Sequence, residues 1–302
     1  MSAAPATGIP FHIGRGAVSA SIAPVGAALR AVTVDGVDLV PGYPDELPTP
    51  AACGVVLVPW PNRVRAGAWS QRDRSYQLAL SEPQLGNASH GLLRFATYAA
   101  DEVAPDSVTL RAPVVPQTGY PFHLDTRVTY RVAERGIEVR HEITNVGGED
   151  APVAVGTHPY LQISDVATSD LTVEIDAATR YLLDDRKLPV GTAPVDAAHD
   201  LRTPRRVGDL DIDTAYADPV RDDEGRIHGL LRAPDGRTVD LWAGEGFTHL
   251  QAFTTDRFPG TPVAIAIEPM TAPADALNSG DGLRWLAPGE SWRLVWGIDL
   301  VV

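Results

Sequence analysis

Several residue types and patterns are scarce in this chain of 302 residues. Its one cysteine, Cys53, permits no disulfide within the chain and precedes an apolar run, which predicts a buried position. Its one lysine, Lys187, lies in a polar stretch, so we do not expect Schiff-base chemistry, which requires a desolvated amine. No basic run occurs and the formal net charge is −14, which argues against binding to nucleic acids or anionic membranes.

Long apolar runs are also missing. No stretch approaches the ~18 apolar residues of a membrane-spanning helix, and the first residues lack the features of a signal peptide. We therefore expect a cytoplasmic protein with no membrane association. No ligand-spaced cluster of His, Cys and carboxylates and no phosphate-binding glycine loop occurs, so we expect neither a metal nor another cofactor.

What the sequence does contain is alternation of apolar and polar residues with period two. Segments 124–132 and 137–143 both alternate and are joined by a short turn, which predicts an antiparallel hairpin. The Asp-Gly pairs at 35–36 and 235–236 predict two more hairpin turns. Further strands are expected at 19–23, 76–80, 108–112, 153–156, 171–176, 249–254, 263–267, 284–286 and 293–298.

Helical periodicity is almost absent, and segment 272–278 is the one modest candidate. Many short strands separated by turns predict an all-β fold, a large antiparallel β-sandwich or barrel with few short helices. Because no break in composition marks a boundary, we expect residues 1–302 to form a single domain. The polar segment 188–226 is predicted to be a strand-poor excursion over the surface.

Three polar residues lie at the ends of predicted strands. Glu268 ends the predicted apolar strand 263–267 and is followed by a proline. An ionised carboxylate loses solvation at such a place, so a glutamate there is expected to have a functional role. His90 precedes a glycine and His158 precedes a proline, so both imidazoles lie where a strand gives way to a loop. One carboxylate and two imidazoles are suited to proton transfer near neutral pH.

Four segments taken in order resemble the aldose 1-epimerase (galactose mutarotase) family. They are Pro-Trp-Pro-Asn-Arg-Val at 59–64 followed by Gly67, the segment 87–94 centred on His90, Thr-His-Pro-Tyr at 157–160, and Ala-Ile-Glu-Pro-Met at 266–270 leading into 278–280. Each is a weak match alone, and the four in order are a strong one. The resemblance spans roughly residue 59 to the C-terminus and is greatest to a bacterial branch whose sugar preference varies.

The resemblance implies a galactose mutarotase-like β-supersandwich and a role for each matching residue. Glu268 matches the base that takes the proton of the anomeric hydroxyl. His158 matches the acid that protonates the ring oxygen, and His90 matches a second histidine that hydrogen-bonds the sugar. The implied activity is an isomerase that interconverts the α and β anomers of a free aldohexose such as glucose or galactose, acting as a monomer or homodimer.

Four further residues are implied to bind the substrate. Arg63 matches an arginine that holds sugar hydroxyls, and Asn62 precedes it in the same motif; a simple ion pair of Arg63 with Glu82 or Asp73 is the plainer alternative. The hydroxyl-binding acid matches Asp213 best, with Asp211 left open. If 90–94 is an extended strand, Arg94 lies on the same face as His90, roughly 13 Å along, where it could meet a C6 substituent.

Other functions remain open at this stage. An epimerase for a hexose with a phosphate or sulfonate at C6 would use Arg94 as its anion-binding group, although an ordinary ion pair of Arg94 is as consistent with the sequence. A carbohydrate-binding protein of the same fold would lack the proton-transfer pair, and both members are present here. A glycoside hydrolase needs two carboxylates flanking the bond, and Glu268 alone has a motif context.

Overall fold

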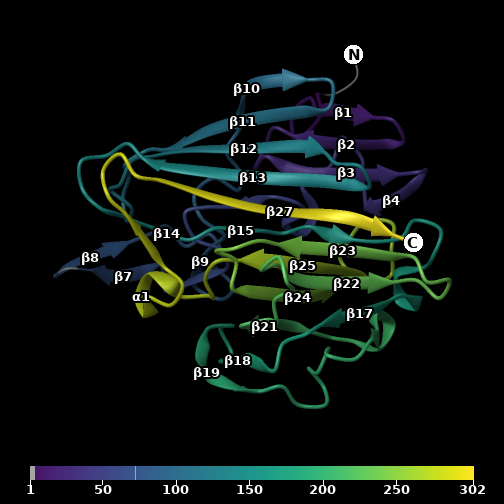
Figure 1. The fold of residues 1–302 in the computed structure, drawn as a ribbon. Helices are drawn as coiled ribbons and strands as arrows, with labels where there is room; N and C mark the ends of the chain where they lie inside the picture. Colours follow the sequence, from purple (N-terminus) through teal and green to yellow (C-terminus); the bar gives the residue numbers. More distant parts are fainter. Residues whose placement is uncertain (1–3, 72) are drawn as a thin grey trace.

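The computed structural model describes residues 4–71 and 73–302, and its regular structure is almost entirely antiparallel β-sheet (Figure 1). The largest sheet has nine strands in the spatial order β10 (Ala99–Ala104), β11 (Ser107–Val114), β12 (Leu124–Val132), β13 (Gly136–Asn145), β27 (Ser291–Val301), β23 (Thr238–Ala243), β22 (Ile227–Arg232), β17 (Thr172–Ile175) and β20 (Arg205–Arg206). The predicted hairpin 124–132/137–143 is confirmed as β12 and β13.

The second large sheet has eight strands. Its order is β19 (Pro189–Pro194), β18 (Thr179–Leu183), β21 (Asp213–Ala217), β24 (His249–Thr255), β25 (Ala264–Met270), β15 (Gly156–Thr157) and β5 (Val56–Leu57), with β16 (Tyr160–Leu161) also paired to β25. This sheet carries the candidate site.

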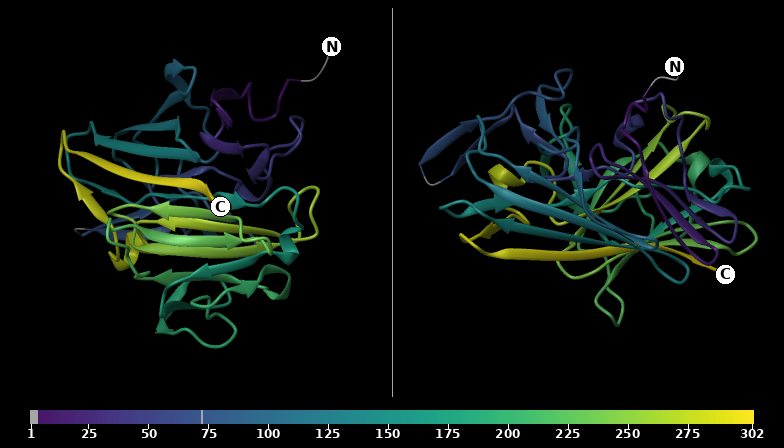
Figure 2. Two further views of the ribbon diagram at one scale, coloured as in Figure 1. Left: turned by 45° about the vertical axis from the view of Figure 1, so that its right-hand side comes forward. Right: turned by 90° about the horizontal axis from the view of Figure 1, so that it is seen from above.

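Smaller sheets complete the fold. A four-stranded sheet, β1 (Phe11–Arg15), β2 (Val18–Ala23), β3 (Ala28–Val34) and β4 (Val37–Val40), packs against β11, β12 and β13, as the two views of Figure 2 show. The two-stranded pairs are β14 (Ala151–Val153) with β26 (Arg284–Leu286), β6 (Arg63–Arg65) with β9 (Asn87–Ser89), and β7 (Ala68–Gln71) with β8 (Arg74–Gln77).

The core lies between the two large sheets, and period-two alternation builds it. On β24 and β25, Leu250 and Ile267 belong to the main apolar cluster, and Ile267 packs against Gly229 of β22 in the other sheet. The intervening residues, Gln251 and Glu268, lie on the opposite face and line a cavity. One face of the eight-stranded sheet therefore stabilises the fold while the other is free to carry chemistry.

Several local expectations were wrong. β25 does not end at Glu268 but continues to Met270, and the strand expected at 76–80 lies earlier, as β8 (Arg74–Gln77). The supposed strand-poor segment 188–226 contains β19, β20 and β21, which extend both large sheets. The helix is shorter than 272–278: α1 covers only Ala276–Ser279, beside the short helices η1 (Pro50–Ala52), η2 (Thr168–Asp170) and η3 (Val207–Asp209). Segment 90–94 is a turn rather than an extended strand, because His90 and Gly91 both have positive φ. No helix among residues 4–71 and 73–302 is long and apolar enough to cross a membrane.

Candidate active site

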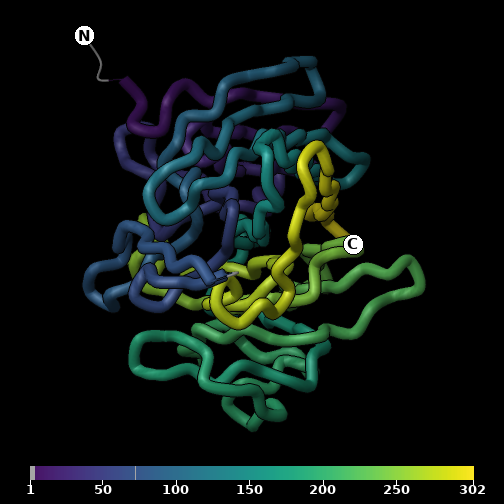
Figure 3. Tube along the Cα trace, turned by 90° about the vertical axis from the view of Figure 1, so that its left-hand side faces the viewer, coloured from purple at the N-terminus to yellow at the C-terminus, as the bar shows by residue number. Residues whose placement is uncertain are grey.

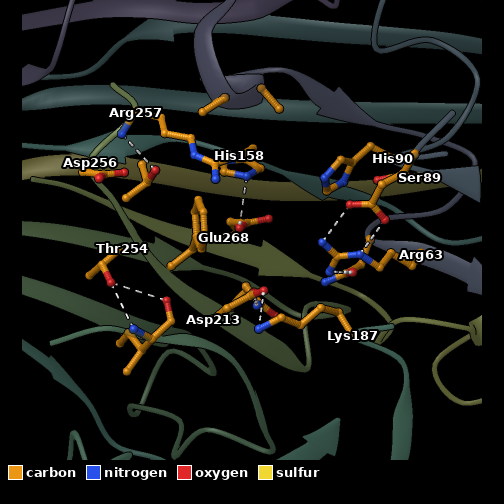
Figure 4. A pocket seen from close by; sticks show the side chains of 18 of the residues that line it. Arg63, Ser89, His90, His158, Lys187, Asp213, Thr254, Asp256, Arg257 and Glu268 are labelled. Atoms are coloured by element: carbon orange, nitrogen blue, oxygen red, sulfur yellow. Dashed lines mark hydrogen bonds and ion pairs between the residues drawn. The ribbon is translucent and has the colours of Figure 1, made fainter. Parts of the chain in front are cut away.

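A cavity of about 950 Å³ opens on the face of the eight-stranded sheet that points away from the core (Figure 4). Its walls come from segments far apart in the sequence: the β5–β9 region, the β15–β16 turn, the β18–β19 hairpin, and strands β21, β24 and β25. The structure brings together all seven residues that the sequence singled out as the site, which are Asn62, Arg63, His90, Arg94, His158, Asp213 and Glu268.

Glu268 and His158 meet at the floor of this cavity. Glu268 lies on β25, and His158 lies in the turn between β15 and β16, which both pair with β25 and so hold the imidazole beside the carboxylate. Glu268 Oε1 is 3.3 Å from His158 Nε2, and the two side chains are 4% and 6% exposed. Glu268 Oε2 has no hydrogen-bond partner among the described residues.

Burial shifts the acid–base properties of this pair in opposite directions. Desolvation, reinforced by the charge of Asp213, raises the pKa of Glu268 well above its usual value. Desolvation lowers the pKa of His158 to about 4. At neutral pH burial therefore disfavours both charged forms, and a proton shared by Glu268 and His158 can move over the short distance between them.

His90 lies beside this pair in a constrained turn. Its backbone has φ 62°, and its amide N–H donates to the carbonyl of Asn62 over 2.7 Å. The His90 and His158 rings lie edge to face, with centroids 5.7 Å apart. The His90 Nδ1 atom is buried and has no partner among the described residues. Burial, and then the neighbouring His158, lower the pKa of His90 well below its ordinary value, so it is a neutral hydrogen-bonding group.

Arg63 forms an ion pair with Glu82, which the sequence left open as the simpler role for this residue, and it also lines the cavity. Arg63 Nε and Nη2 donate to the two carboxylate oxygens of Glu82 over 2.8 and 3.0 Å, and Nη1 donates to Asn62 Oδ1 over 3.2 Å. Burial by itself would lower the pKa of Arg63, but the Glu82 carboxylate raises it overall. Glu82 also lines the cavity and is only 13% exposed, so the bidentate pair fixes the guanidinium in the wall.

Asp213 is favoured over Asp211 by its contacts. Asp213 begins β21, accepts a hydrogen bond from Gln251 Nε2 over 2.5 Å and lies 3.6 Å from the ammonium group of Lys187. Asp211 also lines the cavity but is exposed and precedes the strand. Gln251 pairs with Glu268 across β24 and β25, and its Oε1 is buried without a partner among the described residues.

Sequence reasoning missed Gln251 as a site residue and placed Lys187 in a polar loop outside the site. The signal for Gln251 was a polar side chain in the apolar strand 249–254, but its relevance depends on the register that sets it opposite Glu268. The local sequence around Lys187 does not indicate a site residue, because Lys187 reaches the cavity only through the position of the β18–β19 hairpin in the fold.

Arg94 faces the same cavity although its segment is a turn. Its guanidinium carbon lies 4.4 Å from the centre of the Phe95 ring, and among the described residues it makes no ion pair. Burial lowers its pKa from the ordinary value. Arg94 is therefore a half-buried cation in the wall with no acidic partner in contact.

Together these groups can move protons and hold hydroxyl groups. The floor offers a carboxylate and an imidazole in contact, and the walls offer both hydrogen-bond donors and acceptors. Across residues 4–71 and 73–302, no group of three or more His, Cys, Asp or Glu side chains is arranged to hold a metal ion. The arrangement suits acid–base chemistry on a polyhydroxylated molecule.

Comparison with known proteins agrees with this chemistry. Residues 11–298 match the family described as aldose 1-epimerase. The chain is 31% identical to a protein of Escherichia coli K12 described as the uncharacterized protein YihR, over 97% of this chain and 93% of that one.

Solved structures resemble the fold at lower identity. The GalM/aldose epimerase homologue of C. elegans is 19% identical with a TM-score of 0.84, covering 97% of this chain and 98% of that one. A galactose 1-epimerase of Lactobacillus acidophilus is 19% identical with a TM-score of 0.80, covering 97% and 94%. These structures show the all-β galactose mutarotase-like fold for this chain.

Proposed function

The chain belongs to the aldose 1-epimerase family, and we propose that it interconverts the α and β anomers of a free aldohexose by opening and reclosing the sugar ring. The observation that carries this proposal is the contact of Glu268 Oε1 with His158 Nε2, 3.3 Å apart on the floor of a polar cavity. A protein that only bound sugars would have no need of two buried titratable groups in contact, since each costs desolvation free energy.

In the proposed reaction, two protons move and one ring bond breaks. The proton shared by the pair first passes from Glu268 Oε1 to His158 Nε2 across their 3.3 Å contact. The Glu268 carboxylate then takes the proton of the anomeric hydroxyl while His158 Nε2 gives its proton to the ring oxygen. The C1–O5 bond breaks and C1 becomes an aldehyde. Rotation about C1–C2 and the reverse proton transfers close the ring on the other face. Buried groups with shifted pKa values can do this without a cofactor.

The wall residues bind the sugar in this scheme. His90, neutral because of its burial, would hydrogen-bond the sugar near the ring oxygen. Arg63, held by Glu82 and Asn62, would donate to ring hydroxyls, and Asp213 would accept from others. Each of these groups is held by a neighbour before the substrate arrives, which lowers the entropy cost of binding.

A neutral aldohexose is the substrate class that the cavity supports best. The acidic side chains of its lining are matched in number by its cations once buried Glu268 is set aside: Glu82, Asp211, Asp213 and Asp256 against Arg63, Arg94, Lys187 and Arg257. Two of these cations, those of Arg63 and Lys187, are already paired with acids. The net charge of −14 also disfavours anions at long range.

Arg94 favours a second candidate, an epimerase acting on a hexose with an anionic group at C6. A half-buried guanidinium without an acidic partner is a suitable site for a phosphate or sulfonate. Comparing kcat/KM for glucose, glucose 6-phosphate and 6-sulfonated glucose separates the two candidates. A preference for a charged sugar that disappears in Arg94→Ala would replace the neutral-sugar proposal.

Polarimetry tests the proposed function directly. Enzyme added to freshly dissolved α-glucose or α-galactose should accelerate the approach to equilibrium rotation. Glu268→Gln keeps the size of the side chain but removes the base, so kcat should fall by ~10²–10⁴-fold. Glu174→Gln on β17, outside the cavity, is the matched control and should keep the wild-type rate. A wild-type rate no faster than spontaneous mutarotation on every aldohexose tried contradicts the proposal.

A further inference from the structure

We propose that Lys187 is a specificity-determining residue that donates a hydrogen bond to the sugar at the ring edge opposite the anomeric carbon, an inference that rests on the function proposed above. Lys187 is the only lysine among 302 residues, and it lines the same cavity as Glu268. Its ammonium group lies 3.6 Å from Asp213 Oδ2. Figure 4 shows the side chain reaching toward Asp213 from the edge of the site.

The hairpin that carries Lys187 is fastened to the opposite wall. Arg186 donates from Nε to the carbonyl of Leu85 over 2.9 Å and from Nη2 to the carbonyl of Gly86 over 2.5 Å. The Asn87 side chain donates back to the carbonyl of Arg186 over 3.0 Å. Figure 3 shows the β18–β19 hairpin and the segment around residue 85 on the same side of the molecule. These contacts fix the backbone next to Lys187 at the edge of the cavity, from which its side chain reaches Asp213.

The sheet register sets how far Asp213, the partner of Lys187, lies from Glu268. Gln251 of β24 is paired with Glu268 on one side and with Ala215 of β21 on the other, and Asp213 lies two residues before Ala215 on the same strand. Two strand spacings and two residues along the strand place the two backbones roughly 12 Å apart. A pyranose with its anomeric hydroxyl at Glu268 can span that distance and bring its C3 and C4 hydroxyls to Asp213 and Lys187. There the carboxylate accepts and the ammonium donates, which is the pair that a hydroxyl can satisfy in both roles.

The ion pair of Lys187 with Asp213 contributes little to the stability of the fold. The Lys187 side chain is 46% exposed, and exposed ion pairs contribute little to stability. A charge-assisted hydrogen bond to a substrate hydroxyl is worth more, and its loss should lower kcat/KM about 10- to 100-fold. The hydroxyl takes no part in ring opening, so the loss should appear in KM with kcat preserved.

The experiment combines variants of Lys187 with deoxy sugars. Mutarotation and calorimetric sugar binding are measured for wild type, Lys187→Met and Lys187→Arg with glucose, galactose, and 2-, 3- and 4-deoxyglucose. Arg202→Met, which removes an exposed cation paired with Asp200 outside the cavity, is the matched control. We expect Lys187→Met to raise KM and the dissociation constant for glucose, to have little effect on 3- or 4-deoxyglucose, and to reduce the discrimination between glucose and galactose. Lys187→Arg should recover part of the affinity.

Several results would overturn the inference. An equal loss on all five sugars shows that Lys187 only supports Asp213, and a loss that vanishes on 2-deoxyglucose alone places Lys187 at the wrong edge of the ring. Unchanged affinity in Lys187→Met also contradicts it. Binding separates this inference from the proposed function: if wild type binds sugars without accelerating mutarotation, the proposed function fails while the binding data still decide the role of Lys187. If wild type binds none of the sugars, both fail.

Discussion

At the scale of single residues, the site holds a buried carboxylate that the fold alone does not need. Glu268 is almost fully buried, its Oε2 atom has no partner among the described residues, and its pKa is raised by desolvation. Arg63 contributes a favourable charge, but Asp213 adds repulsion that acts against it. Such an arrangement sacrifices stability for reactivity, as expected of a group kept ready to exchange a proton.

This cost gives a pH-dependent prediction for stability. The folded protein binds the Glu268 proton more tightly than the unfolded chain does, so the free energy of unfolding falls as pH rises from the unfolded pKa through the raised folded pKa. Glu268→Gln removes this loss. The Tm of this variant should therefore exceed that of wild type by a margin that grows as the pH rises above the ordinary pKa of a glutamate, at roughly 2–4 °C per kcal/mol. Thermal unfolding followed by circular dichroism measures it, and a margin independent of pH contradicts the assignment.

His158 should act in the opposite direction in acid. Its pKa is lowered to about 4 by burial, so the folded state binds that proton less tightly than the unfolded chain. The stability from keeping the imidazole neutral is present above its unfolded pKa and is lost as pH falls toward the folded value. Wild type should thus lose up to about 3 kcal/mol between pH ~6.5 and pH ~4 that His158→Asn does not lose. Urea unfolding of both proteins at a series of pH values tests this, and parallel pH dependences would count against it.

The two groups should also fail to act independently in catalysis. Glu268→Gln and His158→Asn each remove one partner of a coupled proton transfer, and each should lower kcat by ~10²–10⁴-fold. Because neither remaining group can complete the reaction alone, the double variant should be little slower than the worse single variant. Single-turnover polarimetry on all three variants and wild type gives the comparison. Losses that multiply would show that the two side chains serve separate steps.

The sequence located these residues because their local motifs are distinctive. Glu268 follows an apolar run in the sequence, and His90 and His158 each lie beside a glycine or a proline. Gln251 was out of reach of such reasoning, because its place opposite Glu268 is a fact of register rather than of local sequence.

At the scale of elements, the turn that carries His90 depends on the glycine after it. Gly91 has φ 71°, and a Cβ atom there would lie 2.1 Å from the carbonyl oxygen of Val58. Gly36 has a similar φ of 80° but open space around it, so Gly36→Ala should cost only the backbone strain of about 1 kcal/mol. Gly91→Ala adds a backbone collision and should cost several times more, and it should lower kcat/KM by displacing His90.

Urea unfolding and polarimetry on the two variants test this pair. Since both carry the same substitution at similar φ, the difference between them isolates the contact with Val58. Equal destabilisation, or a Gly91→Ala variant with full activity, would show that the turn can relax around an added methyl group.

The accuracy of the element predictions follows the strength of the local pattern. The alternation in 124–132 and 137–143 is strong, and the structure has strands at both places. Segment 188–226 lacks a comparable pattern, because its strands are short, rich in small or polar residues and partly exposed. They form because their backbones pair with neighbouring strands, as β21 pairs with β18 and β24, and a single sequence does not reveal this pairing.

At the scale of the whole molecule, the class of the fold could be predicted but not its strand order. The pairing of β13 with β27 joins residues about half a chain length apart, with Val139 opposite Trp296. Local alternation shows which face of each strand is apolar and leaves its partner open. The resemblance to a known family, rather than periodicity, supplied the expectation of a supersandwich.

This topology predicts cooperative unfolding of the whole chain. β27 lies between β13 and β23 and thereby joins the N-terminal and C-terminal parts of the nine-stranded sheet, and the main apolar cluster includes residues from Ile13 to Leu300. We therefore expect a single domain whose tryptophan fluorescence and far-ultraviolet circular dichroism follow one coincident transition in urea. The six tryptophans report from residues 60 to 296. A saturating hexose should move both curves to higher urea by the same amount, since the residues that line the cavity extend from Thr49 to Glu268 and the cavity is lost when either part unfolds. Two separated transitions, or a sugar shift confined to one probe, would show that the chain folds as more than one unit.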